Sequence, residues 1–69
     1  MRESIITYTG EEHDIDLSKV ENCGFGIEEN SYYLHFKMPL DSYVHLSVTY
    51  DEMLRVASDY INHLKETNR

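Results

Sequence analysis

The chain has 69 residues and a formal net charge of −7, with 13 acidic residues against six lysines and arginines. This length accommodates one folded domain, residues 1–69, with a small hydrophobic core that a second subunit would help to stabilise. A single cysteine excludes an internal disulfide. Without an apolar leader or spanning segment, the sequence predicts a cytoplasmic protein that makes no use of a membrane. Direct binding of nucleic acid is not expected either, because a polyanion requires a concentrated basic surface.

The first predicted strand covers residues 4–9, which are mostly β-branched or aromatic. A turn is expected at residues 10–13. Residues 14–20 are compatible with two structures, a returning strand or a short helical turn that begins at Asp16.

Three later segments alternate between apolar and polar residues with a period of two, which predicts half-buried strands. They are residues 23–28, 32–38 and 43–48. A two-residue turn at Asn30 and Ser31 would set Ile27 opposite Leu34, and residues 39–42 form the next loop.

The last two strands have equal parity, so two registers are open. One register sets His35 opposite His45, and the other sets Lys37 opposite His45.

A C-terminal helix is predicted over about residues 50–66. Its apolar residues recur every three or four positions, at Met53, Val56, Ala57, Tyr60, Ile61 and Leu64, with Leu54 beside them. Thr49 and Glu52 have the spacing of a capping box at the start of the helix. Asp51 and Arg55 have the spacing of an ion pair on its surface.

Together these elements predict an α+β fold with two layers. A small antiparallel β-meander of four or five strands, within residues 4–48, is covered on one face by the C-terminal amphipathic α-helix. The sheet side of the core is expected to comprise Phe25, Ile27, Tyr32, Leu34, Phe36, Met38, Val44, Leu46 and Val48, with Cys23 also pointing inward.

Two groups of residues are candidates for contact with a partner. Six of the seven net negative charges lie in the first thirty residues, and the acidic candidates are Glu11, Glu12, Asp14, Asp16, Glu28 and Glu29. An acidic surface attracts basic partners and gains rate and specificity from electrostatic steering. The aromatic candidates are Tyr33, His35, Tyr43 and His45, which are expected on the solvated face of the sheet. They would border a strip without side chains at Gly24 and Gly26 on the same face. Tyrosine-rich surfaces suit protein or dimer contacts.

Catalytic and metal chemistry are not expected, and no cofactor is predicted. His35 and His45 could supply two ligands to a metal, but transition-metal sites usually need three or four. Asp59 and His63 form an acid–imidazole pair on the helix, but no nucleophile is placed to use it. The chain is therefore not expected to be an enzyme.

These features favour a small acidic interaction protein. The specific expectation is an inhibitor or adaptor that docks on a basic surface of another protein and competes there with nucleic acid, like inhibitors that mobile genetic elements encode. Two alternatives are a self-associating structural protein whose homodimer forms through the aromatic residues, and a small-ligand binder at a subunit junction that uses His35 and His45.

Overall fold

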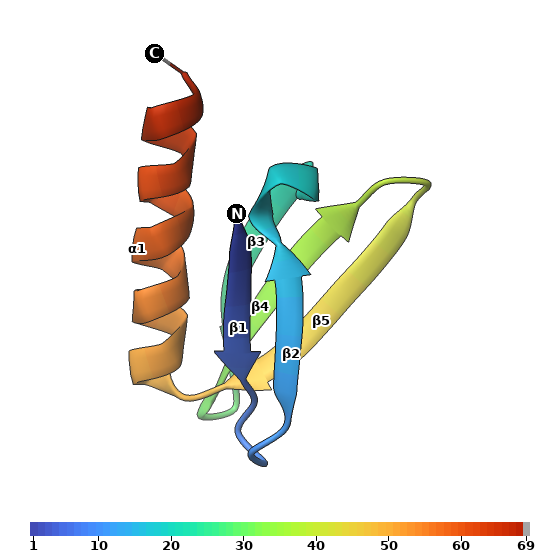
Figure 1. Cartoon of the computed structure of the whole chain (residues 1–69). Coiled ribbons are helices and arrows are strands. Elements are labelled where there is room, and N and C mark those ends of the chain that lie inside the picture. Colours follow the sequence, from blue (N-terminus) through green and yellow to red (C-terminus); the bar gives the residue numbers. More distant parts are fainter. Residues whose placement is uncertain (69) are drawn as a thin grey trace.

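A computed structural model describes residues 1–68 (Figure 1). The elements in chain order are β1 (Arg2–Ile6), β2 (Glu12–Asp16), the 3-10 helix η1 (Leu17–Lys19), β3 (Asn22–Glu28), β4 (Ser31–Met38), β5 (Ser42–Val48) and α1 (Tyr50–Thr67). The predicted α+β class, with a C-terminal helix packed on antiparallel strands, is confirmed. The five strands form two sheets, however, and not one continuous meander.

One sheet is the β1–β2 hairpin, and the other has the strand order β3-β4-β5. Figure 1 shows β1 between α1 and β2, with the three-stranded sheet behind them. The hairpin and α1 together cover one face of the three-stranded sheet, because residues of the hairpin, the helix and this sheet pack in one core.

The core consists of eight buried apolar side chains. They are Ile5, Ile15, Leu17, Leu34, Phe36, Leu46, Val48 and Val56. Tyr32, Met38, Val44 and Cys23 are partly buried around them, as predicted for inward positions. Ile5 and Ile15 come from the hairpin, which supplies part of the cover that the sequence analysis assigned to the helix alone.

The prediction that Phe25 and Ile27 belong to the core is wrong. Their exposed fractions are 45% and 69%, and Ile61 of the predicted helix stripe is 49% exposed. Both β3 side chains have the parity of the inner face, since Phe25 lies opposite the buried Leu34. They stay exposed because β3 is the edge strand, and neither the hairpin nor α1 extends far enough to cover them.

The register between β4 and β5 sets His35 opposite His45, which selects one of the two open alternatives. The predicted turn between β3 and β4 is wrong by one residue. The two turn residues are Glu29 and Asn30, with φ angles of 47° and 70°, and Ile27 therefore lies opposite Tyr32 rather than Leu34. Two successive positive φ angles are those of a type I′ turn, whose twist matches that of the flanking strands.

Both structures considered for residues 14–20 occur in succession. β2 ends at Asp16, whose side chain caps η1 by accepting a hydrogen bond from the backbone N–H of Ser18 at 3.1 Å. The turn before β2 lies earlier than residues 10–13, because Glu12 is already paired with Ile6.

At the start of α1, one of the two hydrogen bonds of the predicted capping box is present. Thr49 accepts a hydrogen bond from the backbone N–H of Glu52 at 3.2 Å. The Glu52 carboxylate instead accepts from the backbone N–H of Ile6 at 2.7 Å, which fastens α1 to β1. Arg55 binds Glu52 and Asp59 on its own helix, and not the expected Asp51. Within residues 1–68, no helix has the combination of length and apolar character that a membrane crossing requires.

Candidate functional site

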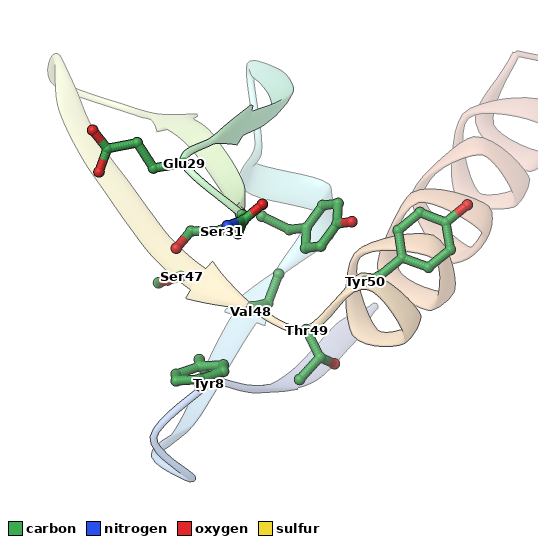
Figure 2. A pocket seen from close by; sticks show the side chains of 9 residues that line it. Tyr8, Glu29, Ser31, Ser47, Val48, Thr49 and Tyr50 are labelled. Atoms are coloured by element: carbon green, nitrogen blue, oxygen red, sulfur yellow. The ribbon is translucent and has the colours of Figure 1, made fainter.

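A pocket of about 460 Å³ lies at the end of the molecule where the β3–β4 turn, the end of β5 and the start of α1 meet. We call it the end pocket. Three tyrosines line it, Tyr8, Tyr32 and Tyr50, together with Glu29 and Val48. Figure 2 shows Val48 in the middle of the pocket, Tyr8 and Tyr50 on either side of it, and Glu29 at the outer margin.

Local structure positions each of these tyrosines. Tyr50 is the first residue of α1 because Thr49 caps the helix. Its ring lies 5.2 Å from the ring of Tyr32, in a tilted arrangement typical of aromatic pairs. Tyr8 follows β1, and its backbone N–H donates to the carbonyl of Ser47 at 2.8 Å, which joins the hairpin to β5. Tyr8 is 73% exposed and Tyr50 is 49% exposed, so part of each ring is accessible to a ligand.

A second hollow adjoins the end pocket and shares Tyr8 and Ser47 with it. Glu11 and His13 line this hollow, with the Glu11 carboxylate 3.7 Å from the His13 imidazole. Glu29 and Glu11 thus bring negative charge to the two sides of Tyr8. Figure 1 shows the β1–β2 and β3–β4 turns at the same end of the molecule, which is also the end where α1 begins.

The six predicted acidic residues do not behave alike. Glu11, Glu12, Glu28 and Glu29 are exposed in or beside the two turns at this end. Asp14 instead forms an ion pair with Arg2 at 2.9 Å. Asp16 accepts a 2.6 Å hydrogen bond from the Ser18 hydroxyl, and the hydrogen bonds from Ser18 hold the pKa of Asp16 below its ordinary value. Asp14 and Asp16 are therefore engaged within the chain. Of the other four carboxylates, Glu11 has partners in residues 1–68, His13 at 3.7 Å and Thr9 at 3.4 Å, and Glu12, Glu28 and Glu29 form no ion pair there.

The four predicted aromatic residues do come together, on the solvated face of the three-stranded sheet. We call them the aromatic face: Tyr33, His35, Tyr43 and His45. The rings form a row, with centroid distances of 4.8 Å for Tyr33–His45, 5.6 Å for His45–His35 and 5.4 Å for His35–Tyr43. The Nδ1 atoms of the two histidines lie 3.3 Å apart, within hydrogen-bond distance of each other.

Three further features of residues 1–68 concern metal and nucleophile chemistry. No group of three or more histidine, cysteine, aspartate or glutamate side chains in that range could hold a metal ion. Asp59 is paired with Arg55 at 3.3 Å, which draws the carboxylate away from the predicted pairing with His63. Burial raises the pKa of the Cys23 thiol to about 11, so it stays protonated at neutral pH and is a poor nucleophile.

The end pocket is the part of the site that sequence reasoning missed. Its tyrosines come from three segments that are distant in sequence, and the parity of β4 assigns Tyr32 to the core. One signal pointed to it in part, because the cap at Thr49 places Tyr50 in the first turn of the helix, next to the last residue of β5.

Comparison with protein-family models, curated proteins and solved structures found no match. The function must therefore be inferred from the residues and geometry of the chain itself.

Proposed function

We propose that this chain is a non-enzymatic interaction protein that binds a basic segment of another protein at the end pocket. The observation that supports this most directly is the meeting of three tyrosines with the carboxylates of two separate turns at one end of the molecule. A lysine or arginine side chain is attracted to the face of an exposed tyrosine ring and to a nearby carboxylate at the same time.

The state of the carboxylates supports the same proposal. Glu12, Glu28 and Glu29 form no ion pair with any residue in the range 1–68, so a basic partner would not have to break an existing one. Glu11 has a 3.7 Å contact with His13 and accepts a 3.4 Å hydrogen bond from the Thr9 hydroxyl. Carboxylates at the rim of an interface mainly raise the association rate and set its dependence on salt.

The biological role that follows is that of a cytoplasmic inhibitor or adaptor. Surfaces that bind nucleic acid are rich in lysine and arginine. A small protein of net charge −7 that covers such a surface would compete with the nucleic acid for it.

The proposal is tested with a fluorescently labelled peptide that alternates arginine and glycine, whose binding is followed by fluorescence anisotropy. We expect Glu11→Gln together with Glu29→Gln to weaken binding about tenfold, or about 1.4 kcal/mol. Tyr50→Ala should weaken it a further two- to fivefold, because a cation–π contact contributes about 0.5–1 kcal/mol at exposed sites.

The matched controls change the same charge and the same ring elsewhere. Asp41→Asn with Glu66→Gln removes two negative charges from the β4–β5 loop and the last turn of α1, and Tyr43→Ala removes a ring from the aromatic face. These controls should bind within twofold of the unmodified chain. If the charge controls weaken binding equally, attraction by net charge explains it and the end pocket is not the site. If Tyr43→Ala weakens binding and Tyr50→Ala does not, the partner binds the aromatic face instead.

A further inference from the structure

The outer edge of β3 is an open strand edge. In the sheet order β3-β4-β5, β3 pairs with β4 on one side, and no strand in residues 1–68 pairs with its other side. The backbone N–H of Cys23 donates to the side chain of Asn22 at 2.9 Å rather than to β4. Backbone groups of successive residues in a strand point alternately to its two sides. Phe25 and Ile27 therefore also direct their backbone groups to the open side.

Between Cys23 and Ile27 this edge has no charged residue and no proline, although Glu28 ends the strand and the Asn22 side chain occupies the backbone N–H of Cys23. Proteins protect open edges with charged residues, proline, bulges or very short strands. β3 has seven residues and contains neither a charge nor a proline from Asn22 to Ile27. At about 3.3 Å per residue it offers an edge about 23 Å long.

The flank of α1 that lies on the β3 side is apolar and exposed. It consists of Leu54, Ala57, Ile61 and Leu64, which we call the helix seam. Leu54, Ile61 and Leu64 have exposed fractions of 47%, 49% and 39%. Two sets of contacts show on which flank of α1 the seam lies. Glu52 and Arg55, on the opposite flank, bind β1. Tyr50, at the start of α1, contacts Tyr32 of β4, which is paired with Ile27 of β3.

The spacing of the helix seam indicates what covers it. Its four residues are separated by three, four and three positions, which is the pattern of a helix that packs against another helix. The side chains that α1 directs to its own core, Met53, Val56 and Tyr60, form a different stripe. The helix therefore has one apolar stripe for this chain and a second one for another helix.

A second copy of this chain supplies both a matching strand edge and a matching helix. When two β3 edges pair antiparallel around a two-fold axis, both second layers lie on the same face of the joined sheet. α1 contacts β4, and Tyr60 of α1 and Cys23 of β3 both pack against the core, so the helix lies towards the side of the sheet that ends in β3. The two-fold pairing therefore directs the two helix seams towards each other across the joined strands.

The centre of this arrangement is uncharged, because the helix seam and β3 from Asn22 to Ile27 contain no charged residue. The acidic residues of β2 lie beyond β1, on the far side from α1 (Figure 1). Glu21, Glu28 and Glu29 lie at the two ends of the paired edges, so the association of two copies of net charge −7 should strengthen as salt is added.

We propose that the chain forms a homodimer in which the two β3 strands pair antiparallel around Phe25 and the two helix seams pack against each other. The dimer joins two three-stranded sheets into one of six strands. It also buries the half-exposed Phe25, Ile27 and Ile61, which the isolated chain leaves in water. The aromatic face is not part of this interface.

The oligomeric state tests the proposal by light scattering after size exclusion, over a range of micromolar concentrations. The unmodified chain should have twice the mass of a single copy, and Ile27→Lys and Ile61→Glu should each have the mass of one copy. Leu40→Glu is the matched control, because Leu40 is 99% exposed and lies in the distant β4–β5 turn. It should remain dimeric. A monomeric unmodified chain, or a dimer that survives both interface changes, overturns the proposal.

A covalent cross-link tests the register without relying on a charged variant that could fail to fold. Pairing around Phe25 sets Ile27 of one copy opposite Cys23 of the other. Ile27→Cys should then give a disulfide-linked dimer under mild oxidation with copper phenanthroline, since opposed residues in a strand pair have Cα separations compatible with a disulfide. Within one copy the two positions are four residues apart along a strand and cannot join. Cross-linking no greater than in a Leu40→Cys variant overturns the pairing.

Discussion

At the scale of single residues, Arg55 makes the contacts that matter most for joining distant parts of the chain. Its guanidinium binds the carboxylates of Glu3 and Glu52 and donates to the carbonyl of Ser4 at 2.7 Å. The Glu3 side chain is only 7% exposed, and burial raises the pKa of its carboxyl. Glu3 can remain charged in this position because Arg55 neutralises it.

We therefore expect Arg55→Met to lower the free energy of unfolding by about 2–3 kcal/mol at pH 7, because it leaves a buried carboxylate without a partner. The expected loss lies below that of a fully buried pair because Arg55 is 42% exposed. Adding Glu3→Gln should recover part of the loss, as urea denaturation at fixed protein concentration can show. The control Lys37→Met breaks the exposed 3.8 Å pair with Glu21 and should change stability by less than about 1 kcal/mol. An equal effect of both changes would contradict the assigned role of Arg55.

At the scale of elements, the β4–β5 turn contains an unfavourable residue. Leu40 and Asp41 have φ angles of 63° and 56°, and a positive φ is costly for a leucine. The Leu40 side chain is also 99% exposed, so it gains nothing from burial.

Leu40→Asn should accordingly raise the free energy of unfolding by about 0.5–1 kcal/mol, because asparagine tolerates this backbone conformation. The midpoint of urea denaturation measures the change. Ser42→Asn is a suitable control, since Ser42 is also exposed but is not among the positions with positive φ. Lower stability of Leu40→Asn would mean that the leucine makes a contact the single chain does not contain.

The elements themselves were largely predictable because they depend on local pattern. The alternation in residues 32–38 and 43–48 and the cap at Thr49 identified β4, β5 and α1 within a few residues. The turn at Glu29 and Asn30 was misplaced by one position. That error leaves the parity of every side chain unchanged, so alternation of apolar residues cannot detect it.

Whether another element covers a given strand could not be predicted in the same way, because it depends on tertiary structure. Parity correctly assigned Phe25 and Ile27 to the inner face but could not show that this face is bare at the sheet edge. The same holds for the candidate site. The aromatic face follows from register on adjacent strands, whereas the end pocket requires Tyr8, Tyr32 and Tyr50 to meet from three segments.

At the scale of the whole molecule, few hydrogen bonds fasten the β1–β2 hairpin to the remainder. Apart from the contacts of Arg55, they include the bond from Ile6 to Glu52 and the bond from Tyr8 to Ser47. The hydrogen bond from Arg55 lowers the pKa of Glu52 most, burial opposes it with a smaller effect, and the hydrogen bond from the Ile6 N–H lowers the pKa further. A carboxyl whose pKa is lowered by folding stabilises the protein above its unfolded-state pKa, near 4.3, and loses this contribution as pH falls through the folded value.

Glu52→Gln should thus lower the free energy of unfolding by about 1.5–3 kcal/mol at pH 7, since it weakens charge-assisted hydrogen bonds. The difference from the unmodified chain should shrink as pH falls below the unfolded-state pKa, near 4.3, and should vanish once the pH lies below the lowered pKa of the folded state. Denaturation curves at four or five pH values measure this trend. The control Glu66→Gln, at an exposed position near the end of α1, should show little effect at any pH. A penalty that does not depend on pH would mean that Glu52 acts through packing rather than charge.

The pairing of Arg55 with Glu3 also has a consequence for the order of folding. β3, β4, β5 and α1 follow one another along the chain and can assemble through contacts that are short in sequence, whereas this ion pair closes a loop of 52 residues. Closure of a long loop is entropically costly before other contacts compensate for it. We infer that the β1–β2 hairpin docks after the transition state. Changes at Arg55 should then mainly accelerate unfolding and leave the refolding rate nearly unchanged.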